Sequence, residues 1–234
     1  MGTYTGPNIV KEGLIYLVDA GSERSYSGSG TSVSSLVGSA SSTMHNSVGF
    51  QSGVAYGAWR FDGTDDYIKT TSVLVSSPTQ LTIGGWFKRN GSNTGYATML
   101  HHGLDSSIGA SSFHIGMETS NNQILGAIGS NTGISGGWQN GRTGVYAAQD
   151  VWYYVVSSWD GGQVKIYVDG VLKKTYTLTT YTNNTTPTRL GTSGEATGSY
   201  WFNGDIANVF IAPNVSFSAD EVLKNYNSQK NRYL

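Results

Sequence analysis

Alternating apolar and polar residues predict β-strands over most of the chain. The segment Leu81 to Arg89 puts Leu81, Ile83 and Phe87 on one face of a strand and Trp86 on the other. Further strands are predicted at Glu12 to Asp19, Trp59 to Phe61, Tyr67 to Lys69, Ser112 to Met117, Gln123 to Ile128 and Ile206 to Ala212. The segments Ser112 to Met117 and Gln123 to Ile128 are predicted to form a hairpin, because only a short polar turn separates them.

The clearest pattern in the chain is a three-stranded antiparallel meander. Two strands, Trp152 to Trp159 and Val164 to Val168, precede a third strand that runs through Tyr176. The turns between them are Asp160-Gly161-Gly162 and Asp169-Gly170. Glycine supplies the positive φ angle that such tight turns require.

Two segments depart from the strand pattern. Ser218 and Glu221 form a capping box, with a serine at the N-cap and a glutamate three residues later, ahead of a short apolar stripe. They predict a helix from about Ser218 to Ser228. The Gly- and Ser-rich stretch Ser27 to Ser47 carries only scattered hydrophobic residues, and we expect it to be a surface loop.

About a dozen short strands and one terminal helix indicate two packed antiparallel sheets. The predicted fold class is therefore all-β, a two-sheet sandwich with a short C-terminal helix. A single sandwich domain can reach 234 residues, and no stretch changes in composition as a linker would. We expect one domain over residues 1–234.

Composition and charge narrow the function classes. Charged residues make up 12% of the chain, the net charge is −1, and basic residues never exceed two in a row. Nucleic-acid binding needs a basic patch and is not expected. The chain has no cysteine, no apolar run long enough to span a membrane, and no signal-peptide pattern at its start. The neutral polar surface is typical of proteins that pack into assemblies.

Candidate catalytic chemistry is weak. Glycosidases of sandwich folds use carboxylates two or four residues apart on one strand face, and none of the five glutamates has such an acidic neighbour on a strand. Gly133 to Gly137 has the spacing of a nucleophile elbow but lies in the glycine-rich loop Gly129 to Gly144. We interpret His101 and His102 as polar loop residues rather than metal ligands. The chain is not expected to be an enzyme.

Several motifs, in order along the chain, resemble the concanavalin A-like lectin/glucanase superfamily in its laminin-G/pentraxin-like branch. They include Gly13 to Gly21, Phe61 to Ile68, Leu81 to Phe87, Trp152 to Gly170, Phe202 to Val209 and Phe217 to Glu221. The resemblance implies a concanavalin A-like jelly roll. It also implies a calcium site at Asp62, Asp65 and Asp66. We favour the alternative, in which Asp62 caps its turn and Asp65 and Asp66 accept hydrogen bonds from backbone amides. No cofactor is required.

Aromatic residues outside the predicted strands are the candidates for ligand binding. Trp138 stands in the glycine-rich loop, and Tyr200 and Trp201 lie beside a second glycine-rich segment. Exposed aromatic rings stack on sugars or anchor protein interfaces. Trp138 could instead hold its own loop against the sandwich.

The opening GLIYLVDAG and the closing SADEVLKNYN resemble structural proteins of tailed phages, especially those of cyanobacteria. This resemblance implies a virion protein, made in the host cytoplasm, that decorates a capsid or forms part of a tail or fibre. Its partners would be other virion proteins and copies of itself, most simply as a trimer. Four apolar loop residues are the candidate contacts: Leu36, Val37, Ile134 and Trp138. The alternative is a carbohydrate-binding module that recognises host surface glycans, with or without calcium.

Overall fold

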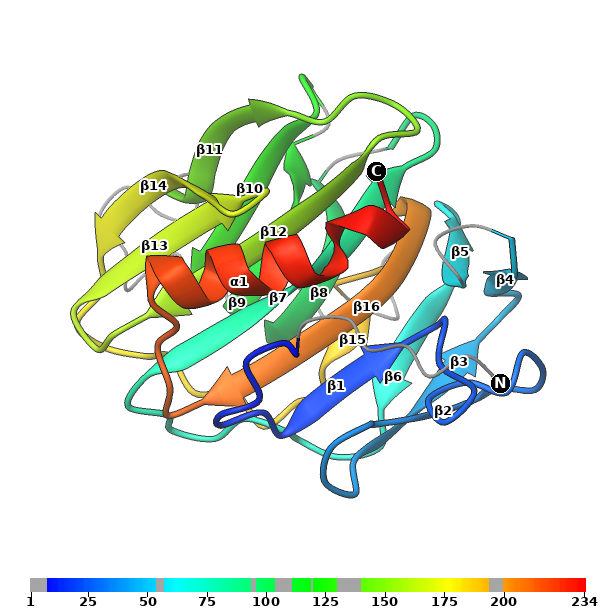
Figure 1. Cartoon of the computed structure of the whole chain (residues 1–234), viewed down its shortest axis with the longest axis horizontal. Helices are drawn as coiled ribbons and strands as arrows, with labels where there is room; N and C mark the ends of the chain where they lie inside the picture. Colours follow the sequence, from blue (N-terminus) through cyan, green and yellow to red (C-terminus); the bar gives the residue numbers. More distant parts are fainter. Residues whose placement is uncertain are drawn as a thin grey trace.

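The computed structural model describes residues 8–53, 57–93, 96–103, 111–118, 120–129, 140–193 and 200–234. Two antiparallel eight-stranded sheets stack as a sandwich, and one α-helix lies near the C-terminus (Figure 1). The predicted fold class is confirmed. The structure resolves more and shorter strands than the dozen expected.

Sheet A runs in the order β14-β13-β12-β7-β16-β5-β4, and β1 pairs with β16 beside this path. Its strands are β1 (Tyr16–Asp19), β4 (Gly49–Gln51), β5 (Ala58–Asp62), β7 (Leu81–Arg89), β12 (Trp152–Trp159), β13 (Gln163–Val168), β14 (Val171–Thr177) and β16 (Asn203–Pro213). The predicted meander is β12-β13-β14. Its turn glycines Gly161 and Gly170 have φ angles of 95° and 78°, as expected.

Sheet B runs in the order β11-β10-β9-β8-β15-β6-β3-β2. Its strands are β2 (Ser32–Ser34), β3 (Ser41–His45), β6 (Tyr67–Thr70), β8 (Tyr96–Gly103), β9 (Ser111–Glu118), β10 (Gln123–Ile128), β11 (Arg142–Tyr146) and β15 (Arg189–Leu190). The hairpin predicted from the two apolar segments is β9-β10. The last residues of the expected glycine-rich loop form strand β11 instead.

The main core lies between the sheets. The predicted faces of β7 are confirmed, because Leu81, Ile83 and Phe87 belong to this core whereas Trp86 belongs to a second apolar cluster. That second cluster covers the outer face of sheet A. Helix α1 (Ala219–Gln229) crosses this face in Figure 1 and contributes Val222 to the cluster. Tyr233, which follows the 3-10 helix η3 (Lys230–Arg232), also belongs to it.

Close packing under the helix explains one glycine of β7. A Cβ atom on Gly84 would lie 2.8 Å from the ring of Phe210 and 2.8 Å from the carbonyl oxygen of Val155. No side chain fits there without displacing the neighbouring strand or the ring. Glycine at this position therefore lets β7 pass beneath the aromatic layer that α1 covers.

Two sequence expectations about the N-terminal region are wrong. The first strand begins at Tyr16 rather than at Glu12, because the residues before it form a turn in which Gly13 has a φ angle of 67°. The stretch Ser27 to Ser47 is not simply a loop: it forms β2 and β3 at the edge of sheet B. Val33 and Met44 are buried in the core, so these scattered hydrophobic residues mark short strands.

None of the helices in the described residues is long and apolar enough to cross a membrane.

Candidate functional site

The outer face of sheet B carries a row of polar and aromatic residues across three adjacent strands. Strand register aligns Tyr96 of β8 with Glu118 of β9, and Glu118 with Gln123 of β10. Their chain neighbours Ala97, Met117 and Ile124 lie in the core between the sheets. Because side chains alternate along a strand, Tyr96, Glu118 and Gln123 face away from that core.

Tyr200 lies beside this row and forms an aromatic platform with Tyr96. The two ring centroids are 5.9 Å apart with an interplanar angle of 33°, and both rings pack against Leu125 and Ala127 of β10. The Tyr200 carbonyl accepts a hydrogen bond of 3.1 Å from the backbone N–H of Thr98. Its φ angle of 84° is a strained value for a tyrosine, since the Cβ atom disfavours that region.

An ion pair borders the platform. The Arg142 Nε of β11 donates to the Glu118 carboxylate at 3.0 Å, and the second guanidinium nitrogen contacts the other carboxylate oxygen. This hydrogen bond raises the pKa of Arg142. Burial, and next the Glu118 charge, raise the pKa of Tyr96, so its phenol stays neutral. Two aromatic rings, a carboxylate and a guanidinium thus lie together on one face.

Two buried histidines continue this face along the strands. His101 of β8 pairs with His114 of β9, and the ring centroids are 6.3 Å apart. The Nε2 atom of His114 lies 3.2 Å from the Thr98 hydroxyl, and that of His101 lies 2.7 Å from the Ser111 hydroxyl. Within the part of the chain that the structure describes, the buried Nδ1 atom of each ring has no hydrogen-bond partner. A Cβ on Gly116 would lie 2.5 Å from the His114 ring, so only glycine leaves space for it.

The electrostatics keep these histidines neutral. Burial lowers the pKa of His114 to about 3 and, with the charges of His114, Arg189 and His102, holds that of His101 well below its ordinary value. His102 faces the core, where its ring stacks on Phe113 at 5.1 Å, and burial lowers its pKa to about 4. The expectation that His101 and His102 are polar loop residues is therefore wrong. They lie in β8, where a β-bulge between Thr98 and Leu100 interrupts the alternation of faces that sequence reasoning relies on.

The aromatic residues singled out in the sequence have different positions. Tyr200 lies on the platform, whereas Trp201 is only 6% exposed and packs against Tyr67 with ring centroids 6.3 Å apart. Trp138 lies outside the described residues. Their role in ligand binding stays a prediction.

Of the residues proposed as contacts between subunits, the structure describes Leu36 and Val37. Leu36 and Val37 are half-buried and pack against the apolar cluster on the outer face of sheet A, within this chain. Ile134 lies outside the described residues. A role of these side chains in assembly stays a prediction, as does the trimer.

The three aspartates of the acidic turn converge. Carboxylate oxygens of Asp62, Asp65 and Asp66 lie within 4.8 Å of one another. Asp62 accepts from the backbone N–H of Thr64 at 2.7 Å, and Asp66 accepts from that of Ser47 at 2.9 Å. Burial raises the pKa of Asp66, and the charges of Asp62 and Asp65 contribute. Hard carboxylate oxygens suit calcium, and calcium binding here stays a prediction.

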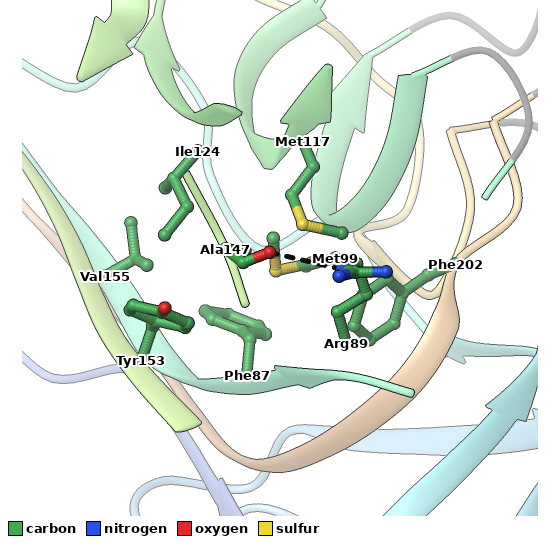
Figure 2. Close-up of a pocket in the computed structure, with 9 residues that line it drawn as sticks. All are labelled: Phe87, Arg89, Met99, Met117, Ile124, Ala147, Tyr153, Val155 and Phe202. Carbon is green, nitrogen blue, oxygen red and sulfur yellow. Dashed lines mark hydrogen bonds between the residues drawn. The ribbon is translucent and has the colours of Figure 1, made fainter. Parts of the chain in front are cut away.

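A small cavity between the sheets offers no room for a ligand. Its volume is about 10 Å³, and Figure 2 shows the side chains that enclose it. The Arg89 guanidinium lies at one side and donates to the carbonyl oxygen of Ala147 at 3.3 Å. The space is about that of one water molecule.

The outer face of sheet B combines two aromatic rings with one bidentate ion pair. Glycoside hydrolysis uses two carboxylates, one on each side of the scissile bond. Glu118 is the one carboxylate among strands β8 to β11, and Arg142 pairs with it. Aromatic rings beside a bidentate ion pair instead match the apolar face and the hydroxyl groups of a sugar.

Sequence reasoning missed Tyr96, Glu118 and Arg142. The hairpin β9-β10 was predicted and would have placed Glu118 opposite Gln123. Strands β8 and β11 were not predicted, so Tyr96 and Arg142 could not be assigned to the same face. Only the tertiary pairing brings these residues together.

Comparisons with known proteins agree with the fold. The family model of the concanavalin A-like lectin/glucanase superfamily matches residues 62–223. The sequence matches none of the curated proteins with which it was compared. No comparison supports the resemblance to phage structural proteins.

Among solved structures, domain 4 of AbnA, an extracellular arabinanase from Geobacillus stearothermophilus in complex with arabinotriose, is similar with a TM-score of 0.64 and 19% identity. The match covers 91% of this chain and 98% of that domain. A Trypanosoma rangeli sialidase in complex with sialic acid has a TM-score of 0.68 and 15% identity, covering 94% of this chain and 33% of that one. The binding domain of Paraclostridial Mosquitocidal Protein 1 has a TM-score of 0.66 and 14% identity, covering 92% of this chain and 52% of that one.

This chain thus spans nearly all of the arabinanase domain but only about a third of the sialidase. The low identities show a shared fold and nothing further. Because the family model matches residues 62–223, which is more than half of the chain and contains strands of both sheets and the start of α1, this protein belongs to the concanavalin A-like lectin/glucanase superfamily.

Proposed function

We propose that this domain binds carbohydrate without hydrolysing it, on the outer face of sheet B. The observation that carries the proposal is the Tyr96–Tyr200 platform beside the Glu118–Arg142 ion pair. A sugar ring would stack on the platform through its C–H face. Its hydroxyl groups would exchange hydrogen bonds with the carboxylate, the guanidinium and Gln123.

The comparisons support this proposal over a role in a phage particle. One similar domain is described in complex with arabinotriose, and another is described as a binding domain. The sialidases have the same fold over a third of their length, and their activity does not transfer at these identities. The platform and the ion pair support the proposal independently of those relatives.

Calorimetric titration with arabinotriose, followed by a glycan array of neutral and acidic oligosaccharides, tests the proposal. We expect binding of at least one glycan, and a loss of about tenfold in affinity in Tyr200→Ala, which equals about 1.4 kcal/mol. Tyr200→Phe keeps the ring and should bind almost as the parent protein does. Leu172→Ala, on the outer face of the other sheet, is the control and should bind unchanged.

The same samples test the absence of hydrolysis. Chromatography of each bound oligosaccharide after prolonged incubation should show no shorter products. If no glycan on the array binds, or if Tyr200→Ala binds as tightly as the parent protein, the proposed site is wrong. Product release that is lost in Glu118→Gln would show instead that the domain is an enzyme.

A further inference from the structure

Thr98 of β8 connects the two halves of the Tyr96–Tyr200 platform. Its side-chain hydroxyl donates to the backbone carbonyl of Tyr96 at 3.3 Å, and its backbone N–H donates to that of Tyr200 at 3.1 Å. The two tyrosines come from different elements, because Tyr96 begins β8 and Tyr200 precedes β16. The separation of 5.9 Å between their ring centroids therefore depends on a residue that holds both backbones.

A β-bulge in β8 makes these contacts available. The register with β9 shifts after Thr98 and leaves Met99 as the extra residue. At the bulge, the Met99 carbonyl accepts from the N–H of Gly191 at 3.2 Å, next to the hydrogen bond between Thr98 and Tyr200. The Gly191 carbonyl accepts in turn from the N–H of Phe202 at 3.0 Å. The backbone that leads into β16 is thus fixed to β8 at this point.

His114 of β9 fixes the direction of the Thr98 hydroxyl. The Nε2 atom of His114 lies 3.2 Å from the Thr98 oxygen. A carbonyl can only accept, so the hydroxyl gives its one proton to Tyr96 and accepts from the Nε2–H of His114. Gly116 pairs with Thr98, and a Cβ on it would lie 2.5 Å from the His114 ring. Glycine therefore leaves the space in which this ring reaches Thr98.

We propose that Thr98 is a positioning residue for ligand binding, which sets the spacing and orientation of Tyr96 and Tyr200 before a ligand arrives. The inference rests on the proposed function, since it concerns the same platform. Thr98 is fully buried, so it acts through the two tyrosine carbonyls and not by contact with a ligand. Rings that are already held in place lose little freedom on binding, which reduces the cost of binding.

Thr98→Val tests the role of the hydroxyl. Valine has the same shape and keeps the N–H for Tyr200, but it removes the hydroxyl that serves Tyr96 and His114. We expect calorimetric titration with arabinotriose to show about fivefold weaker binding. Thr98→Ser restores the hydroxyl and should bind within about twofold of the parent protein. His114→Phe keeps a ring above Gly116 without the donor, and its affinity should lie between those of the parent protein and Thr98→Val.

A measurement without ligand reports the ring spacing itself. The nuclear Overhauser effect (NOE) between the ring protons of Tyr96 and Tyr200 should be weaker in Thr98→Val than in the parent protein and in Thr98→Ser. Thr82→Val is the matched control. It removes a buried hydroxyl of β7 that accepts from the N–H of Phe217 at 2.9 Å, on the other sheet. It should lower the melting temperature and leave the NOE and the affinity unchanged.

An unchanged NOE in Thr98→Val would overturn the inference, whatever the affinity. A weaker NOE with unchanged affinity would also overturn it, because ring spacing would then not matter for binding. Equal effects in Thr82→Val would show general destabilisation instead of positioning. If the parent protein binds no arabinotriose, the NOE alone decides whether Thr98 sets the ring spacing. Failure of the proposed function is therefore distinguishable from failure of this inference.

Discussion

At the scale of single residues, Tyr200 is the position where local conformation and proposed function meet. A tyrosine at a φ angle of 84° is destabilised locally, and packing against Tyr96, Leu125 and Ala127 offsets that strain. Residues in such conformations cluster at binding sites, because the surrounding structure can hold a side chain where a ligand needs it. The strain also provides a test of stability that is separate from the binding test.

Tyr200→Gly should be more stable than Tyr200→Ala, although both variants lose the ring. Glycine adopts positive φ without a steric cost, whereas alanine keeps the Cβ atom, and the expected difference is about 1 kcal/mol. Chemical denaturation of both variants measures it. Equal stabilities, or a less stable glycine variant, would show that the backbone at Tyr200 is not strained.

The sequence predicts well the residues whose side chains follow one strand. The division of β7 between Trp86 on one face and Phe87 on the other follows from alternation alone. Prediction from the sequence fails where polar residues are buried, as at His101 and His114, because no local pattern indicates that tertiary contacts will cover them. The platform is a case of the same kind: Tyr200 could be named as a candidate, but its contact with Tyr96 depends on strand pairing.

At the scale of elements, α1 is the segment in which sequence and structure agree most closely. The helix spans Ala219–Gln229 with Ser218 as its N-cap, one residue from the predicted end. The Ser218 N–H donates to the Glu221 carboxylate at 2.8 Å, and the Ser218 hydroxyl accepts from the Glu221 N–H at 3.3 Å. A capping box is readable because all its partners lie within four residues of sequence.

Ser218→Ala should lower the free energy of unfolding by about 1 kcal/mol, because it removes the acceptor for the Glu221 N–H. The helix carries Val222 and Tyr226, which cover Trp86, so weaker docking should also expose that indole. Thermal denaturation followed by tryptophan fluorescence measures both effects. Asn227→Ala, at an exposed position in the same helix, is the control and should not lower the melting temperature. An unchanged melting temperature in Ser218→Ala would contradict the capping interpretation.

The short strands were the elements least accessible to prediction. β2 and β3 have three and five residues, too few for alternation to be distinct in a Ser- and Gly-rich stretch. Their stability comes from the pairing of β2 with β3 and of β3 with β6, and from burial of Val33 and Met44. Long elements with local signals were predicted, whereas elements that exist through tertiary contacts were not.

At the scale of the whole molecule, the two outer faces of the sandwich differ in how they are covered. The outer face of sheet A is covered by α1 and by the segment that contains Leu36 and Val37. The outer face of sheet B carries the platform and the buried histidines. The edge strand β14 carries Lys173 and Lys174, charges that hinder edge-to-edge pairing, so self-association through this edge is disfavoured. Binding is therefore expected on the outer face of sheet B.

The stability of the whole domain should fall as the pH is lowered below about 6.5, the ordinary pKa of histidine. His102 and His114 have folded-state pKa values of about 4 and about 3, so between these values and 6.5 the unfolded chain binds more protons than the folded one. Each group then removes up to about 1.4 kcal/mol of stability per pH unit over that interval.

The raised pKa values of Asp66 and Asp169 act in the opposite direction, because protonation of these carboxyl groups favours the folded state. The histidine contribution begins below pH 6.5 and lasts until His102 takes up its proton near pH 4, so the decrease should fall in this interval, and melting temperatures from pH 8 to pH 4 measure it. His102→Phe keeps the stack on Phe113 and removes one titrating group, so its melting temperature should fall less steeply. The same slope in both proteins would show that His102 does not contribute to the acid sensitivity of the fold.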